Sequence, residues 1–401
     1  MTIKRFLKLF FIILLLVCGV TGGFVLYGSE ALPDRILTVT GEIPAAPFFT
    51  VSAVGARAVP AAADTGGSDT TAQAVRFLGV IPVKTVTVTK TRRRYVTVGG
   101  ELVGIRLRTE GVTVVGTESF EGESGPADPA KDAGLRPGDV ILRLGGRTVD
   151  SNKTLTAIIE NSGGNPLQVE AERENETLTL TLTPQKTKAT GTYKGGVWVR
   201  DTAAGIGTLT FSDAQTGRLA ALGHAIYDAD SGEALRVNRG AVYTAAAAGV
   251  TKGIPGRAGE IEGTIEKTQL GTVDSNTDAG VYGDLTAPPA QEETEDRYPV
   301  ATASEVHTGS AQICCTVSGT EKRLYDIEID RIYKNGDRDK NMTVTVTDTA
   351  LLAKTGGIVQ GMSGSPILQD GMFVGAVTHV FVNDPASGYA IFAEKMLEEA
   401  G

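Results

Sequence analysis

The sequence GMSGSP, residues 361–366, has the residue types that a serine nucleophile requires. A nucleophilic serine stands on a sharp turn, where its own N–H group and that of the residue two positions earlier converge on a developing oxyanion. Gly361 and Gly364 flank Ser363 and permit such a turn. We therefore predict Ser363 as the nucleophile and the N–H groups of Gly361 and Ser363 as the oxyanion hole. Ser365 is the alternative nucleophile.

A general base for this serine has to come from one of three histidines, His224, His307 and His379. A single histidine is more often structural than catalytic. His224 follows the strand-like sequence GIGTLTF and is preceded by glycine, which allows a close approach to a site. We select His224 as the base.

An acid is expected to orient this base, and the order His–Asp–Ser along the chain is one that known triads use. Asp348 ends the strand-like sequence MTVTVTD and precedes the predicted nucleophile by 15 residues, which is a short separation. Asp228 and Asp230, just after His224, are the alternatives. The residues alone do not choose among the three.

The sequence after the nucleophile, ILQDGMFVGAVTHVFV, predicts a β-hairpin that turns at Asp370–Gly371. Residues 361–366 resemble the nucleophile loop of chymotrypsin-like proteases, Gly-Asp-Ser-Gly-Gly/Ser-Pro, with Met362 in place of the acidic residue. The resemblance implies a β-barrel peptidase domain with a hairpin behind the serine.

Composition agrees with a mostly β fold, because 50 of the 401 residues are glycine and only 6% are aromatic. The net charge is -9, and the basic residues Lys4, Arg5 and Lys8 precede the apolar N-terminal stretch, so the remainder is more acidic still. We therefore exclude nucleic acid as a partner. The one basic run, residues 92–94, is interpreted as a solvated turn.

Three cysteines provide no disulfide framework. Cys314 and Cys315 are adjacent, where a bridge would be strained, and we interpret them as small strand residues. We expect no metal ion and no organic cofactor.

The N-terminus predicts a transmembrane helix. Residues 9–27 carry no charge and are dominated by large apolar side chains, long enough to cross a hydrocarbon core of about 30 Å. The basic residues ahead of it place the N-terminus in the cytoplasm and the rest of the chain outside. We favour a retained anchor, residues 1–27, over a cleaved signal.

The remaining chain is divided by composition. Residues 28–74 are rich in Ala, Pro, Gly and Thr and are expected to form an extracytoplasmic linker, with folded structure beginning at Val75. Residues 75–187 are assigned to a small α+β domain with a preceding strand, and residues 188–401 to the peptidase domain.

The sequence AKDAGLRPGDVILRLGGRTV resembles the PDZ family. A short helix would end at Gly134, residues 137–139 would form a turn in which the Asp139 side chain binds backbone amides, and residues 151–159 would form a helix. Val103, Gly104 and Ile105 would then correspond to the loop that holds a peptide C-terminus in that family. The alternative for these three residues is an ordinary strand without a ligand.

Taken together, KTGGIVQGMSGSPILQDGMFVGAVTHVFVNDPASGYAI, GTLTF, ALGHAIYD and VTD resemble the stage IV sporulation protein B peptidases. The resemblance implies that His224, Asp348 and Ser363 form the triad. It also implies self-cleavage and cleavage of a membrane-bound regulatory protein that controls a late sigma factor, in the intermembrane space of the developing spore. The chain itself would then be a substrate. Separately, Gly104 and the Gly134–Asp139 signature predict that the PDZ-like groove binds a segment of this chain or of a partner and so times the protease.

Two other functions are compatible with the domain order. The first is a non-catalytic PDZ-bearing membrane scaffold, for which the glycine-flanked serine has no use. The second is an envelope quality-control protease, in which the PDZ domain normally follows the protease domain rather than preceding it.

Overall fold

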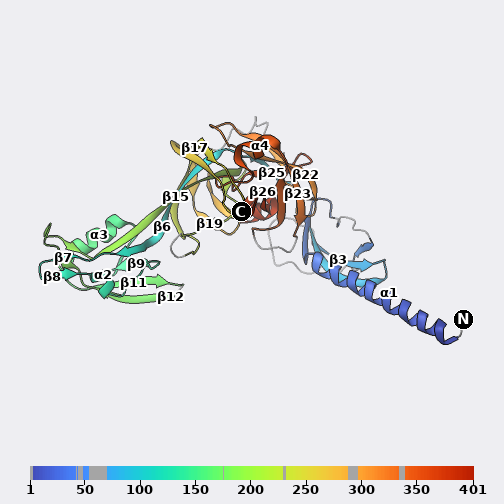
Figure 1. Ribbon diagram of the computed structural model, residues 1–401, viewed down its shortest axis with the longest axis horizontal. Coiled ribbons are helices and arrows are strands. Elements are labelled where there is room, and N and C mark those ends of the chain that lie inside the picture. Colours follow the sequence, from blue (N-terminus) through green and yellow to red (C-terminus); the bar gives the residue numbers. More distant parts are fainter. Residues whose placement is uncertain are drawn as a thin grey trace.

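The computed structural model describes residues 3–41, 43, 48–53, 70–174, 176–228, 232–287, 297–333 and 339–401. These residues form mostly β structure, as predicted. Figure 1 shows an elongated molecule with a helix and a small sheet at one end, a PDZ-like domain at the other and the predicted peptidase domain between them.

The N-terminal end consists of one long helix and a four-stranded sheet. The elements are α1 (Ile3–Ala31), β1 (Arg35–Thr38), β2 (Phe49–Ala53), β3 (Thr70–Phe77) and β4 (Ile81–Lys90), with the sheet order β1-β4-β3-β2. Residues Phe10–Glu30 of α1 are long and apolar enough to cross a membrane, and the most apolar 18 residues of that stretch are not buried.

The small sheet differs from the expected linker. Residues 35–38 and 49–53, which were expected to belong to the linker, form strands. β3 begins at Thr70, five residues before Val75, where folded structure was expected to begin. Ile36 of β1, Val75 of β3 and Val86 of β4 form a small core, and Phe49 of β2 packs against it. The composition of residues 28–74 concealed this sheet because so few large side chains hold it together.

The PDZ-like domain has its own apolar core. Its elements are the second half of β6 (Leu102–Thr117), β7 (Phe120–Gly122), β8 (Gly125–Ala127), α2 (Pro129–Asp132), β9 (Val140–Leu144), β10 (Arg147–Thr148), α3 (Asn152–Glu160), β11 (Leu167–Arg173) and β12 (Glu176–Leu182). Ser151 caps α3 by accepting a hydrogen bond from the Thr154 N–H, so the predicted helix is confirmed within one residue.

The turn before β9 also forms as predicted. Gly134 and Gly138 both have positive φ, at 85° and 92°. The buried Asp139 carboxylate accepts hydrogen bonds from the Arg136 N–H at 2.9 Å and from Arg173 Nε at 2.6 Å. This ion pair fixes the turn against β11.

Two long strands connect the PDZ-like domain to the peptidase domain (Figure 1). β6 pairs with β15 (Val197–Asp213) along almost its whole length. One half of each strand packs on the PDZ-like core, while the other half lies in the peptidase sheet, where β6 also pairs with β17 (Val237–Thr251). A single sheet therefore runs through both domains.

Val103, Gly104 and Ile105 lie in the peptidase half of β6, and not in a loop. They pair with residues 205–207 of β15 on one side and with residues 242–244 of β17 on the other. Val103 and Ile105 are buried. With a strand on each side, this segment has no open edge to which a peptide could add, so the expected carboxylate-binding loop is a strand in the centre of the sheet.

The peptidase domain combines an open sheet with a closed barrel. The sheet contains β5 (Tyr95–Val98), β6, β15, β16 (Arg218–Ala221), β17, β18 (Glu260–Val273), β19 (Ser275–Thr277), β20 (Gly280–Asp284) and β21 (Arg297–Pro299). The barrel order is β22 (Gly309–Cys315), β23 (Arg323–Ile332), β24 (Met342–Val346), β27 (Asp384–Phe392), β26 (Met372–Phe381) and β25 (Pro366–Gln369).

Four short elements complete the chain. β13 (Gln185–Lys186) and β14 (Tyr193–Lys194) form a small ribbon between the domains, α4 (Thr349–Thr355) joins β24 to β25, and α5 (Ala393–Ala400) follows the barrel. Asp370 and Gly371 turn the hairpin of β25 and β26 with positive φ, as predicted. Cys314 and Cys315 are buried at the end of β22 and form no disulfide bond with each other.

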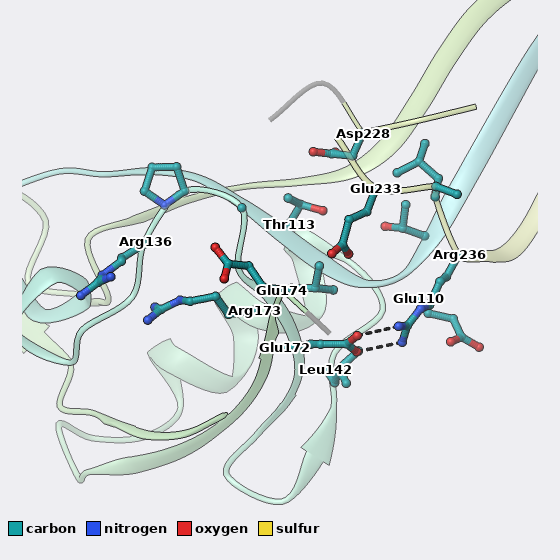
Figure 2. Close-up of a pocket in the computed structure, with 16 residues that line it drawn as sticks. Glu110, Thr113, Arg136, Leu142, Glu172, Arg173, Glu174, Asp228, Glu233 and Arg236 are labelled. Atoms are coloured by element: carbon teal, nitrogen blue, oxygen red, sulfur yellow. Dashed lines mark hydrogen bonds and ion pairs between the residues drawn. The ribbon is translucent and has the colours of Figure 1, made fainter. Parts of the chain in front are cut away.

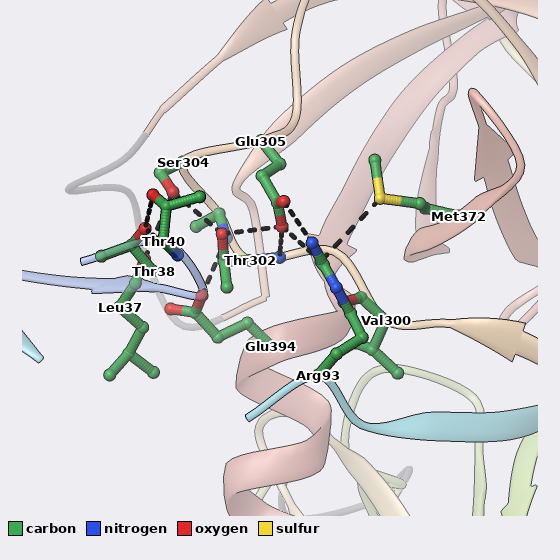
Figure 3. Close-up of polar contacts among 11 residues, drawn as sticks. Leu37, Thr38, Thr40, Arg93, Val300, Thr302, Ser304, Glu305, Met372 and Glu394 are labelled. Atoms are coloured by element: carbon green, nitrogen blue, oxygen red, sulfur yellow. Dashed lines mark hydrogen bonds and ion pairs between the residues drawn. The ribbon is translucent and has the colours of Figure 1, made fainter. Parts of the chain in front are cut away.

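The basic run at residues 92–94 is not a solvated turn. Arg93 donates to both carboxylate oxygens of Glu305 at 2.6 Å and to the Val300 carbonyl, as Figure 3 shows. In the same cluster, Ser304 Oγ donates to the Leu37 carbonyl of β1. The basic run therefore secures the N-terminal part of the chain to the peptidase domain, through partners more than 200 residues away that no local pattern reveals.

Candidate active site

The predicted nucleophile lies on a glycine turn between α4 and β25. Gly361 and Gly364 have φ values of 98° and 90°, which other residues adopt only with strain. A Cβ atom on Gly364 would lie 2.4 Å from Leu222 N and from Thr208 O. The turn thus presses directly against the main chain of β15 and of the segment after β16.

Thr208 of β15 holds this turn in place. Its N–H donates to the Ser363 carbonyl at 3.0 Å, and its hydroxyl donates to the Gly361 carbonyl at 2.8 Å. Ser365 is fully buried and its hydroxyl faces Thr208 Oγ1 at 3.4 Å. Ser365 therefore contributes to the support of the turn, whereas Ser363 is partly exposed.

The predicted oxyanion hole has two uncommitted donors. The next two N–H groups of the turn are engaged, since Gly364 donates to the Val377 carbonyl and Ser365 to the Met362 carbonyl. Within the part of the chain that the structure describes, the N–H groups of Gly361 and Ser363 have no acceptor. Donors held ready in this way suit an oxyanion that forms during the reaction.

His224 approaches from the open sheet. It follows a tight turn after β16 in which Leu222 and Gly223 both have positive φ, at 71° and 70°. Its Nδ1 lies 2.7 Å from the Ala225 carbonyl oxygen. Because a carbonyl only accepts, the proton belongs on Nδ1, and Nε2 keeps a lone pair with which to accept a proton.

Burial governs the charge of this imidazole. It lowers the pKa of His224 below its ordinary value, while the Ala225 carbonyl and the Asp339 carboxylate raise the pKa to a lesser extent. A lowered pKa keeps the ring neutral at neutral pH, as a general base requires.

Ser363 and His224 line one cavity of about 440 Å³ between the sheet and the barrel. Most of its wall is apolar and comes from both sides, with Ile206, Leu222, Ile226, Ile358, Val359 and Val380 among the lining residues. Ser363 Oγ donates to the Thr378 carbonyl at 2.9 Å, so its hydroxyl is held by β26 in this state.

Neither of the two described acid candidates, Asp348 and Asp228, lines this cavity. The Asp348 carboxylate caps α4 by accepting from the Leu351 N–H at 2.8 Å, and Asp348 is not one of the residues that line the cavity. Asp228 is buried, 3.7 Å from the Arg200 guanidinium. Asp230 lies outside the described residues.

The structure brings His379 to the site, a residue that sequence reasoning passed over. Its ring centroid is 4.9 Å from that of His224, and its Nδ1 is 3.6 Å from Asp339 Oδ2. His379 lies in β26, directly behind the nucleophile turn, and this position in the predicted hairpin was the signal that could have found it. His307, by contrast, is exposed and pairs with Asp370 at 2.7 Å.

A second, charged cavity of about 280 Å³ lies where the PDZ-like domain meets the segment after His224 (Figure 2). Arg236 Nη1 donates to Glu172 Oε2 at 2.8 Å across this junction. Among the described residues, no group of three or more His, Cys, Asp or Glu side chains is placed to hold a metal ion.

A serine on a glycine turn that lines the same cavity as a histidine whose Nδ1 is bonded to a carbonyl fits a serine-peptidase type of site. Residues 191–397 match the family model described as SpoIVB peptidase S55, and residues 102–183 match the PDZ domain model. The first match covers more than half of the 401 residues. The chain belongs to the SpoIVB peptidase S55 family and is a serine peptidase that carries a PDZ domain.

Solved structures show more distant similarity. The PDZ domain of the SdrC-like protein from Listeria monocytogenes is 19% identical, with 23% of this chain and 90% of that chain covered and a TM-score of 0.20. The active form of the Rv3671c protease from M. tuberculosis is 14% identical, with 49% and 72% covered and a TM-score of 0.30. A search of curated proteins found no match.

Proposed function

We propose that Ser363 and His224 hydrolyse peptide bonds by acyl transfer. The observation that carries this assignment is that both side chains line one cavity, next to two N–H groups that have no acceptor among the described residues. Ser363 Oγ attacks the substrate carbonyl carbon while its proton passes to His224 Nε2, and the N–H groups of Gly361 and Ser363 bind the oxyanion.

The second half of the reaction uses the same groups. The C–N bond breaks as His224 returns its proton to the leaving amine, which leaves an acyl ester on Ser363. Water then attacks this ester with His224 as the base, and the carboxylic acid product departs as Ser363 recovers its proton. No cofactor enters either half.

Asp348 is the proposed acid on the basis of the family resemblance alone. Its carboxylate is the N-cap of α4, the helix that leads into the nucleophile turn. Asp348→Asn therefore changes both the cap of α4, which supports the turn, and any catalytic role of the carboxylate. A loss of activity in this variant alone does not distinguish the two.

We further propose that the peptidase is membrane-tethered, faces the outside of the cytoplasmic membrane and acts in sporulation signalling. Its substrates would be its own chain and a membrane-bound regulatory protein. The family membership and the exposed apolar helix α1 support this proposal. The PDZ domain would bind a segment of the chain itself. Val197 and Val199 of β15, which pack against its core, support a cis contact of this kind.

The experiment uses the full chain in lipid vesicles. Wild-type protein is compared with Ser363→Ala, His224→Gln and Asp348→Asn, and with Ser310→Ala as a control on an exposed part of β22. Fluorophosphonate labelling identifies the reactive serine, and mass spectrometry reads the fragments. We expect Ser363→Ala to abolish labelling and self-cleavage while Ser310→Ala changes neither. Self-cleavage at the normal rate by Ser363→Ala would exclude the assignment.

The sporulation role has a separate test in the organism that carries the chain. Ser363→Ala in the chromosomal copy is expected to prevent formation of heat-resistant spores while vegetative growth is unchanged. Normal spore counts with this variant would contradict the role in sporulation without affecting the chemistry.

A further inference from the structure

His379 contacts the proposed base in a way that the family triad does not account for. The rings of His224 and His379 are 4.9 Å apart between centroids and are inclined by 37°. His224 comes from the open sheet and His379 from β26 of the barrel. The contact therefore spans the same cleft as the nucleophile and the base.

Among the residues that the structure describes, His224 has no hydrogen bond to a carboxylate of the kind that usually orients a catalytic histidine. Its Nδ1 is bonded to the Ala225 carbonyl, which fixes the tautomer. A carbonyl dipole stabilises the imidazolium formed during proton transfer less than a full negative charge does. The carboxylate whose charge raises the pKa of His224 is that of Asp339.

Asp339 reaches the site beside His379. Its Oδ2 is 3.6 Å from His379 Nδ1, and the Asp339 side chain is 18% exposed. The His379 Nδ1 atom is itself buried and has no hydrogen-bond partner among the described residues. A buried polar atom of this kind calls for an explanation, and a shift of less than 1 Å would bring it into hydrogen-bond range of the carboxylate.

The residue before His379 connects the same groups to the nucleophile. The Thr378 carbonyl accepts the hydrogen bond from Ser363 Oγ, and the Thr378 hydroxyl donates to the Asp339 carbonyl at 3.0 Å. Two consecutive residues of β26 thus touch the proposed nucleophile, the proposed base and the residue that carries the nearby charge.

We propose that His379 and Asp339 are positioning residues for His224. His379 packs against the imidazole, and the Asp339 carboxylate stabilises the positive charge that the imidazole acquires when it accepts the proton of Ser363. This inference rests on the proposed roles of Ser363 and His224. It adds to the serine and the base a histidine and a carboxylate that both come from the barrel side of the cleft.

The surrounding charges agree with this arrangement. Burial and the neighbouring His224 lower the pKa of His379, Asp339 raises it and Lys340 lowers it. His379 is therefore neutral at neutral pH and leaves the charge of Asp339 available to His224. Protonation of both rings at once is opposed by their mutual repulsion.

The test measures inactivation by a fluorophosphonate, because this reaction reports the nucleophilicity of Ser363 without a known substrate. The maximal rate and the half-saturating concentration are measured between pH 4.5 and pH 9, values of about two units on either side of an ordinary histidine pKa. The variants are His379→Ala, His379→Gln and Asp339→Asn. His307→Gln and Asp370→Asn are matched controls, because that pair is exposed and lies away from the cleft.

We expect His379→Ala to lower the maximal rate about 10²-fold, at the low end of what general-base catalysis contributes, with little change in the half-saturating concentration. His379→Gln, which keeps a polar side chain next to Asp339, should recover part of the rate. Asp339→Asn should lower the rate and also move the acid limb of the profile to lower pH, since the carboxylate raises the pKa of His224. The controls should match the wild type.

The outcomes distinguish failure of the proposed function from failure of the positioning role. Labelling of Ser363→Ala at the normal rate would refute the proposed function itself. Wild-type rates and pH profiles for both His379→Ala and Asp339→Asn, with Ser363→Ala inactive, would refute only the positioning role. If His379→Ala does not fold, His379→Gln and Asp339→Asn decide, because both keep the volume of the side chain. An unshifted acid limb in Asp339→Asn would also overturn the role of Asp339.

Discussion

Thr208→Val tests how the open sheet holds the nucleophile turn. Valine has the shape of threonine without its hydroxyl, so the change removes the hydrogen bond to the Gly361 carbonyl and keeps the one from the N–H to the Ser363 carbonyl. Thr208 is 1% exposed, which leaves little room for water to replace the lost donor. A buried carbonyl without a partner costs about 1–3 kcal/mol of unfolding free energy.

The expected shift in melting temperature follows from this cost. In a domain of about 200 residues, each kcal/mol corresponds to about 2–4 °C. The rate should change as well, because Gly361 provides one of the two proposed oxyanion donors. Complete loss of one oxyanion donor lowers kcat about 10²–10³-fold. In Thr208→Val the turn is loosened but the donor is still present, so we expect the rate to fall about 10-fold or more.

The assay combines thermal unfolding of the full chain with the fluorophosphonate inactivation rate, and Thr208→Ser is the matched control because it restores the hydroxyl. We expect Thr208→Val to be less stable and slower, and Thr208→Ser to lie close to the wild type. If Thr208→Val kept both the wild-type melting temperature and the wild-type rate, the hydrogen bond would have no part in shaping the site. Equal losses in both variants would point to packing of the methyl group instead.

Three further predictions follow from single contacts. Gly364→Ala should prevent the turn from forming and abolish labelling, because the new Cβ would lie 2.4 Å from Leu222 N; intact labelling would contradict this. The pKa of His224 is lowered, so the activity should persist below pH of about 6.5, the ordinary histidine pKa. It should fall only when the pH drops through the lowered pKa and His224 becomes protonated. The pH profile of kcat/KM, which reports the free enzyme, checks this. Arg173→Leu should destabilise the PDZ domain by about 3–5 kcal/mol, measured by chemical denaturation, because it leaves the buried carboxylate of Asp139 without its partner.

The sequence predicted those features that depend on local chemistry. The glycine turn at residues 361–364, the hairpin at Asp370–Gly371, the cap of α3 and the turn at Asp139 are each specified within a few residues. Glycines at positive φ and short side-chain caps depend only on residues close to them in sequence. A short stretch of sequence is therefore enough to predict them.

The features that the sequence did not predict depend on distant partners. Arg93 lies in what looks like a solvated turn until Glu305, 212 residues later, is placed beside it. His379 is one of three candidate bases in the sequence, and only the fold places it against His224. Val103–Ile105 fit a PDZ loop by spacing, but pairing with β17 makes them a central strand. Long-range pairing decided each of these outcomes.

The continuous sheet joins the PDZ domain physically to the peptidase site. β15 passes from Val197, packed on the PDZ core, to Thr208, which holds the nucleophile turn. A rigid strand would transmit any displacement of the PDZ domain directly to that turn. The pairing with β6 is irregular between Trp198 and Val199 and between Arg200 and Thr202, however, so bending is concentrated there, between the two domains.

A second connection bypasses these irregular positions. The ion pair between Arg236 and Glu172 joins the segment after His224 to β11 of the PDZ domain. The PDZ domain is therefore joined to both sides of the cleft, to the Ser363 side by β15 through Thr208 and to the segment that follows His224 by the Arg236–Glu172 pair.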